Sequence, residues 1–194
     1  MSTYSIVVFV HVVSAIVLVG GGLLATPAVN SGIERASTIS ELRRWLALGK
    51  PLDRINPASS MILLASGIYL ASVGEWWGVA WVQLAGVLWA VNATLANVAL
   101  RPSIARLART AHGADGEDIT PEVAKLKTSR KLALTTDVML ANDLGVLFLM
   151  VTKPSGYLAP LLVLVIAQLT LVGARQASHL RPGRLASRTG SVTG

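Results

Sequence analysis

The sequence contains no cysteine, and only 14% of its residues are charged. The lack of cysteine excludes disulfides, thiolate metal sites and thiol chemistry, and it leaves the redox compartment undetermined. Soluble domains carry about 25% charged residues, so the shortage of charge excludes an ordinary soluble domain. Histidine is scarce as well, with three in the chain, which limits the imidazole groups available as ligands or proton carriers.

Hydrophobic residues take up the room that charge leaves: they make up 53% of the chain and give a mean hydropathy of +0.59. They gather in five stretches, each near the length of about 20 residues that crosses a bilayer as a helix. We therefore predict an all-α, polytopic membrane bundle with five transmembrane helices, forming one domain over residues 1–175. The predicted spans are residues 4–29, 57–73, 79–100, 132–151 and 157–174.

The basic residues predict how the chain is threaded. Five Lys and Arg follow the first span, seven follow the third and four lie in the tail. The second span is followed by none and the fourth by one. Because short basic loops stay in the cytoplasm, we predict an outside N-terminus and a cytoplasmic C-terminus. The basic loops are then expected to lie against anionic lipids, and nucleic acid is not an expected partner.

The first basic loop holds a short amphipathic helix, predicted over residues 39–48. Thr38 and Glu41 form a capping box at its start, and Gly49 with Pro51 ends it. An amphipathic helix with Trp and Arg beside a span lies in the membrane interface or packs on the bundle as a lid, and both placements stay open. Residues 176–194 are rich in Arg, Ser and Gly and are expected to form a disordered basic cytoplasmic tail.

The spans themselves carry polar side chains, which are costly in lipid and therefore mark a candidate site. We expect these side chains to face one interior and to form a buried polar site. Asp143 lies near the middle of the fourth span and needs a partner or a proton there. The predicted site consists of His11, Asn92, Thr136, Asn142, Asp143 and Gln168.

His11 is the only histidine within a predicted span, and three roles are open to it. It is a packing residue satisfied by another helix, a haem or metal ligand, or a proton carrier. Counting residues from the outer ends of the first and fourth spans places His11 and Asp143 at similar depth. We therefore expect a hydrogen bond between His11 and Asp143, direct or through Asn92, Gln168 or water.

Several catalytic motifs are missing. The sequence has no HExxH, no paired histidines within the spans and no phosphate-binding glycine loop between a strand and a helix. Gly20, Gly21 and Gly22 fall inside the first span and are interpreted as a notch for close helix packing. No internal repeat is evident from the letters. These absences argue against a hydrolase or a nucleotide-driven pump and favour a protein that is not an enzyme.

A histidine early in the first span, followed by a Gly-Gly step in HVVSAIVLVGGG, resembles a bacterial membrane family. This is the domain-of-unknown-function family twenty-two sixty-nine, and the stretches PASSMILLASGIYLA and WWGVAWVQLAG resemble it too. That family is distantly similar to CopD-type copper-resistance proteins and to HemJ-type protoporphyrinogen oxidase, in which a first-helix histidine is associated with haem. The resemblance implies that His11 is the residue that would bind haem b or copper.

Three functions follow from these observations. The first is a multi-pass protein of the bacterial cytoplasmic membrane whose buried polar site, around His11, binds haem b or copper. The second is a small transporter or proton-coupled carrier that uses Asp143, Asn142, Asn92 and Gln168 as a polar path. The third is a non-catalytic subunit or scaffold, in which the polar residues only fix the helix packing. Assembly into a homo-oligomer is left open.

Overall fold

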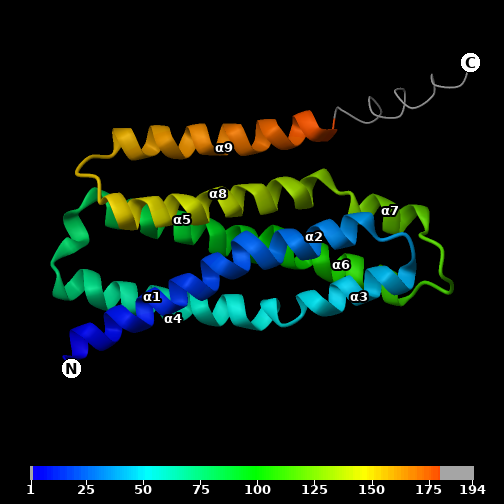
Figure 1. Ribbon diagram of the computed structural model, residues 1–194, viewed down its shortest axis with the longest axis horizontal. Coiled ribbons are helices and arrows are strands. Elements are labelled where there is room, and N and C mark those ends of the chain that lie inside the picture. The colour runs from blue at the N-terminus through cyan, green and yellow to red at the C-terminus, as the bar shows by residue number, and fades with distance from the viewer. Residues whose placement is uncertain (1, 180–194) are drawn as a thin grey trace, which may run out of the picture.

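The computed structural model describes residues 2–179, and within them every regular element is a helix, joined by short turns and loops, with one isolated bridge between Thr38 and Asp118. The predicted all-α class is therefore confirmed. Figure 1 shows the long helices lying side by side, with the N-terminus at one end of the bundle. The elements are α1 (Thr3–Gly20), η1 (Gly21–Ala25), α2 (Thr26–Arg35), α3 (Ile39–Gly49), α4 (Leu52–Val73), η2 (Trp76–Gly78), α5 (Ala80–Leu95), η3 (Ala96–Leu100), α6 (Arg101–His112), α7 (Pro121–Lys127), α8 (Arg130–Thr152) and α9 (Leu158–His179).

Four helical stretches among the described residues are long and apolar enough to cross a membrane. They are Thr3–Gly20, Ile39–Val73, Ala80–His112 and Pro121–Thr152. The apolar part of α9, Leu158–Thr170, is shorter, so a fifth span stays a prediction. Large hydrophobic side chains cover the outside of the bundle, as expected of helices surrounded by lipid. The expected tail begins inside α9, and its residues 180–194 lie outside the described part of the chain.

Two of the long helices are widened by a π-turn, and a proline explains each one. The π-turn η1 separates α1 from α2, and η3 separates α5 from α6, without breaking either helix. Pro27 and Pro102 follow these turns at the second residue of the next helix. Proline has no amide hydrogen, and its ring collides with the carbonyl group one turn earlier. A wider turn relieves that collision, which is a known cause of helix distortion.

The spacing of the π-turns reveals a repeat that the letters do not show. The two π-turns start at Gly21 and Ala96, which are 75 residues apart (96 minus 21). The two prolines, Pro27 and Pro102, are also 75 residues apart (102 minus 27). Each π-turn continues into a helix with proline at its second residue, α2 or α6. A short helix with a threonine N-cap follows, α3 or α7, and then a long helix, α4 or α8. The expectation of no internal repeat is therefore wrong at the level of structure.

The contacts between helices repeat in the same way as the order of the helices. Helix α1 packs along α4 as α5 packs along α8, and α2 contacts α3 as α6 contacts α7. We call residues 3–73 the first half and residues 80–152 the second half. Helix α9 belongs to neither half and packs on α8, beside which it runs in Figure 1.

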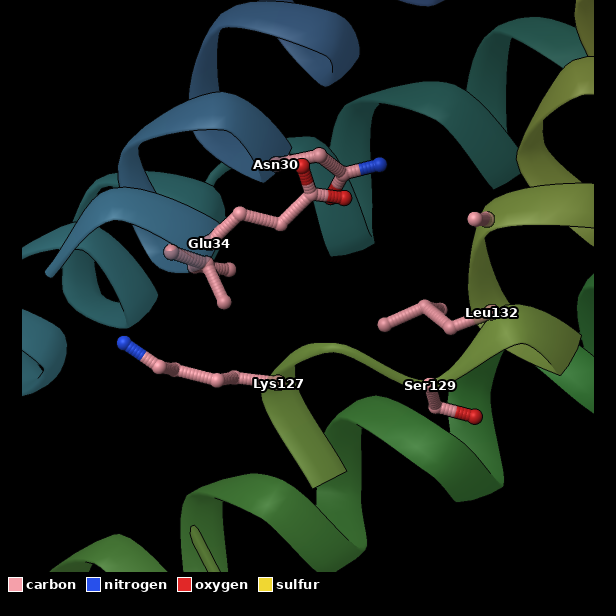
Figure 2. A pocket seen from close by; sticks show the side chains of 7 residues that line it. Asn30, Glu34, Lys127, Ser129 and Leu132 are labelled. Carbon is pink, nitrogen blue, oxygen red and sulfur yellow. The ribbon is translucent and has the colours of Figure 1, made fainter. Parts of the chain in front are cut away.

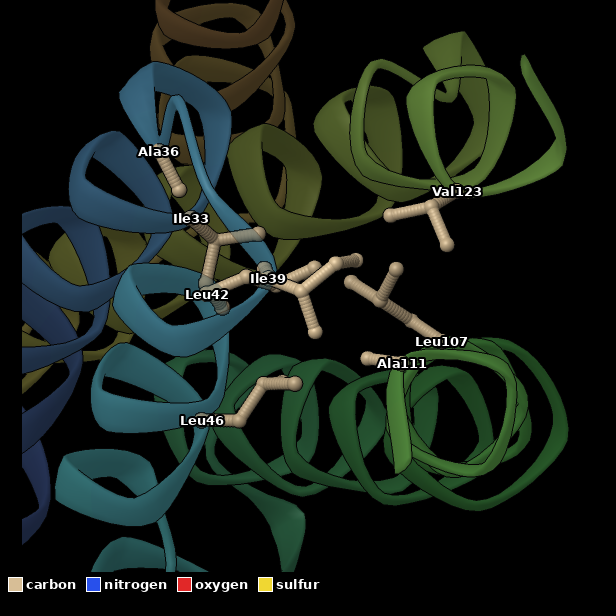
Figure 3. Close-up of a cluster of buried hydrophobic side chains, with 8 residues drawn as sticks. All are labelled: Ile33, Ala36, Ile39, Leu42, Leu46, Leu107, Ala111 and Val123. Atoms are coloured by element: carbon tan, nitrogen blue, oxygen red, sulfur yellow. The ribbon is translucent and has the colours of Figure 1, made fainter. Parts of the chain in front are cut away.

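Helices α2, α3, α6 and α7 form a cap over one end of the bundle, with its own hydrophobic core. Three side chains of α3, Ile39, Leu42 and Leu46, are buried there at 0%, 0% and 6% exposure. Figure 3 shows them pointing at the α6 and α7 residues Leu107, Ala111 and Val123, with Ile33 of α2 alongside. The apolar face of α3 is thus covered by protein, which is the packing expected of a lid. Its depth relative to the lipid headgroups stays a prediction.

Polar contacts hold the cap together at its surface. The Thr38 hydroxyl accepts a hydrogen bond from the Glu41 amide, as the predicted cap requires, and Glu41 in turn accepts from Ser37 rather than from Thr38. The backbone and hydroxyl of Ser40 donate to Glu117, which crosses from the loop before α7. These bonds hold the pKa of Glu41 and of Glu117 below the usual glutamate range.

The opposite end of the bundle is closed by aromatic side chains. The rings of Trp76 and Trp81 lie 5.7 Å apart between centroids. The Lys153 Nζ atom, at the end of α8, lies 5.8 Å from the centroid of each ring. This contact joins the turn between the two halves to the last turn of the second half.

Candidate functional site

The centre of the candidate site is a contact between α5 and α8. The Asn92 side-chain amide donates to Asp143 Oδ1 at 2.8 Å and to the Met139 carbonyl oxygen at 3.2 Å. Both residues are partly buried in the bundle. Because one amide serves a carboxylate and a backbone carbonyl of α8, Asn92 fixes both the position and the rotation of Asp143.

Two further amides extend this contact to a third helix. Asn142 Nδ2 donates to Asn92 Oδ1 at 2.9 Å, and Gln168 Nε2 donates to Asn142 Oδ1 at 2.7 Å. Gln168 comes from α9, and Asn142 is 3% exposed. We call these four side chains the polar chain. Each amide donates toward the next, and the series ends on the carboxylate of Asp143, so every dipole in it favours negative charge at that end.

The second carboxylate oxygen of Asp143 faces the first half of the protein. Asp143 Oδ2 lies 2.9 Å from the position that a Cβ atom would take on Gly22, within η1. On the neighbouring residue, Asn56 Oδ1 of α4 lies 2.8 Å from the corresponding position on Gly21. Gly20 has nothing within 4 Å of that position. Two of the three glycines of the predicted notch, Gly21 and Gly22, therefore each pack against a side-chain oxygen atom of another helix.

His11 lies elsewhere, and its expected hydrogen bond to Asp143 is wrong. Its Nδ1 atom pairs with Ser66 Oγ of α4 at 3.0 Å, and its Cε1 atom lies 3.2 Å from the Cβ position of Gly67. Asp143 contacts Gly22, which is eleven residues, or about 16 Å, farther along the same helix. Figure 1 shows the reason: α1 runs obliquely across the bundle, so equal residue counts from two helix ends do not give equal positions.

Thr136 is buried, but it is not part of the polar chain. Its hydroxyl donates to the Leu132 carbonyl of its own helix at 3.0 Å and accepts from Asn30 of α2 at 3.3 Å. Asn30 also borders a cavity of about 10 Å³, room for no more than one water molecule. Figure 2 shows the cavity between α2 and the start of α8, with Asn30 and Glu34 facing Lys127, Ser129 and Leu132.

The residues around His11 do not fit a copper centre, and haem binding at His11 stays a prediction. No group of three or more His, Asp or Glu side chains gathers within residues 2–179. The His11 ring is packed on Gly67 and hydrogen-bonded to Ser66, so its observed contacts join α1 to α4. Copper sites in proteins are built from several imidazole or sulfur donors, and this site offers one.

Sequence reasoning missed three participants: Asn56, Asn30 and the backbone of Gly22. The first predicted span ends at residue 29 and the second begins at residue 57, so Asn30 and Asn56 lie just outside them. In the structure the first helix continues to Arg35 and α4 begins at Leu52, so both residues are helical. Pro57 suggested a boundary, yet it lies within the first two turns of α4. The signal for Gly22 was Pro27, whose missing amide predicts a distorted turn just before it.

Comparison with known proteins gives one finding. No curated protein and no solved structure matches this chain. A family model described as "Predicted integral membrane protein (DUF2269)" matches residues 5–154. The matched segment contains nearly all of both halves and ends before α9. The protein is therefore an integral, multi-pass membrane protein, and it belongs to the DUF2269 family.

Proposed function

We propose that the protein is a small transporter, a carrier coupled to proton movement through Asp143. The observation that carries this proposal is the polar chain, which links three helices and ends on the partly buried carboxylate of Asp143. Among the described residues, no Lys, Arg or His nitrogen lies within ion-pair distance of Asp143. A carboxylate in the membrane interior without such a partner needs a proton or a cation to neutralise it.

The polar chain gives this carboxylate the means to exist in both states. When Asp143 is charged, Asn92 donates to it, and Asn142 and Gln168 reinforce that bond. When Asp143 is neutral, the same amides remain bonded to one another, so protonation does not leave the chain unsatisfied. A group that changes charge without collapsing its surroundings is what a proton-coupled carrier requires.

The proposed function also requires a membrane and an orientation for the chain. We place the protein in the bacterial cytoplasmic membrane with five spans, α9 being the fifth, and with the N-terminus outside. The cap and its basic residues then lie on the cytoplasmic side, against anionic lipids. His11 serves as a packing residue between α1 and α4 in this account, as its bond to Ser66 supports. A homo-oligomer is compatible with this placement.

The test is the charge moved by a rapid pH change in proteoliposomes adsorbed on a solid-supported membrane. The wild type is expected to give a transient current as Asp143 gains or loses its proton within the membrane field. Asp143→Asn is expected to abolish that current. Asp115→Asn, the same change in an exposed loop residue, is expected to leave it intact. Equal currents from both variants would assign the polar chain to helix packing, as in a scaffold.

A further inference from the structure

The π-turn η1 is followed by Pro27, which removes one backbone donor at its end. Thr26 directs both its amide and its hydroxyl to the Gly21 carbonyl. The next amide along the chain would belong to Pro27, which has none. One donor is therefore missing at the end of the turn: an ordinary residue at position 27 would donate to the Gly22 carbonyl group in a π-turn or to that of Leu23 in an α-helix. Such acceptors persist in a membrane only where something else satisfies them.

Side-chain oxygens approach the same turn from two other helices. Asp143 Oδ2 lies against Gly22, and Asn56 Oδ1 lies against Gly21. Asn56 Oδ1 is buried and has no hydrogen-bond partner within residues 2–179. A carboxylate oxygen and an amide oxygen thus approach two adjacent residues of one π-turn. A positive charge beside the Asp143 carboxylate would neutralise it at this turn.

The location of the turn agrees with a binding role. Gly21 and Gly22 belong to the first half, and Asp143 belongs to the second. Helices α1 and α5 start at the same end of the bundle, so the two halves are parallel repeats. In transporters built from repeats, coupling ions bind between the repeats, where irregular helix turns expose their carbonyl groups.

We propose that η1 and Asp143 form a binding site for a small monovalent cation, a proton or Na⁺, between the two halves of the protein. Asp143 supplies the charge, η1 supplies backbone oxygens, and Asn92 holds the carboxylate in place. The proposal rests on the carrier function above and names the chemical class of its coupling ion. Oxygen ligands and a single carboxylate suit a singly charged ion, whereas divalent metals take more carboxylates or nitrogen ligands.

The segments that pack most extensively around Asp143 carry few other titratable groups among the described residues. On α4, which brings Asn56 to η1, the nearest are Asp53 and Arg54. The segments that pack most extensively on α8 are α5, α9, η1 and η3. Helix α2 reaches α8 through the bond from Asn30 to Thr136, and its titratable residues, Glu34 and Arg35, follow Asn30 toward the cap. Residues 21–25 and 80–100 contain no titratable side chain, and α9 contains none before Arg175. On α8 itself the nearest is Asp137, six residues away and nearer the cap. A response to pH or Na⁺ that is present in the wild type and lost in Asp143→Asn therefore reports on Asp143.

The test compares two glycines of one helix. Gly22→Ala would place a methyl group 2.9 Å from Asp143 Oδ2, so the flexible carboxylate must move away from the turn. Gly20→Ala meets nothing within 4 Å and is the matched control. Pro27→Ala is a second variant that restores the missing amide and favours a regular helix. Asp143→Asn removes the charge.

The readout is the thermal unfolding of each purified variant in nanodiscs. It is recorded in NaCl against choline chloride at fixed pH, and across pH in choline chloride. A bound ion stabilises the folded state by mass action. The wild type and Gly20→Ala are expected to gain stability from Na⁺ or from acid, with at least a tenfold weaker apparent affinity in Gly22→Ala and Pro27→Ala. Asp143→Asn is expected to lose the response.

The arms of the experiment separate the two ions and the two proposals. Stabilisation by Na⁺ identifies Na⁺, and stabilisation by acid alone that is absent from Asp143→Asn identifies the proton. A wild type that responds to neither ion, or a response equal in Gly20→Ala and Gly22→Ala, overturns the site. A response without any transient current would retain the site and refute the carrier function instead.

Discussion

Replacing Asn92 by Ala should loosen the contact between α5 and α8 more than any other single change in the polar chain. Asn92 takes part in three hydrogen bonds, and all of them join these two helices. Interhelical hydrogen bonds in membranes average about 0.6 kcal/mol, so their loss costs about 2 kcal/mol. The substitution also leaves the Asn142 amide and the Asp143 carboxylate without a partner, which raises the expected loss toward about 4 kcal/mol.

The assay is reversible unfolding in mixed micelles, with the free energy of unfolding compared between variants. Asn97→Ala is the matched control, because Asn97 lies about one turn farther along the same helix and bonds only within it, to Ala93 and Arg101. The control is expected to change the free energy by less than about 0.5 kcal/mol. A loss for Asn92→Ala no larger than that of the control would refute the reasoning that the polar chain joins the helices.

Three further predictions concern the cap and the threading. A single cysteine introduced at Gly78 should react with an impermeant reagent from outside the cell, and one at Ser37 should not; the reverse pattern would invert the threading. The Ser40 hydrogen bonds lower the pKa of Glu117 in the folded protein. Glu117 therefore contributes its full stabilisation above the pKa of about 4.3 that it has in the unfolded chain, and this stabilisation is lost as the pH falls through its lower pKa in the folded state. Hydrogen exchange in the loop before α7 should therefore speed up in acid beyond the intrinsic rate, and an unchanged protection factor would argue against this contact. Leu42→Ala should lower stability by about 2–5 kcal/mol, because the side chain is fully buried, whereas the 57% exposed Leu48 should tolerate the same change; similar losses at both positions would place α3 elsewhere.

The sequence predicts those parts of the structure that depend on local patterns. Apolar runs located the helices that cross the membrane, and Thr38 with Glu41 located the start of α3. The cost of polar groups in lipid singled out Asn92, Asn142, Asp143 and Gln168, which the structure joins by hydrogen bonds. These features depend on composition within one helix, or on the general need of buried polar groups for partners.

The sequence does not show in the same way which residues of different helices come into contact. His11 was matched with Asp143 by counting residues from each helix end, but the oblique course of α1 brings Gly22 to Asp143 instead. The repeat is not evident from the letters, because it is preserved only in the spacing of the prolines and of the helix ends. Pro27 and Pro102 were the available signals, since a proline deep inside an apolar run predicts a distorted turn before it.

The central claim is that Asp143 of the second half lies against Gly22 of the first. Because the protein has no cysteine, disulfide trapping in native membranes tests this contact directly. The double variant Gly22→Cys, Asp143→Cys is expected to form an intramolecular disulfide under mild oxidation, since the side chain of residue 143 approaches the Cβ position of residue 22. The double variant His11→Cys, Asp143→Cys is expected to remain reduced. A disulfide in the second variant and none in the first would contradict the account.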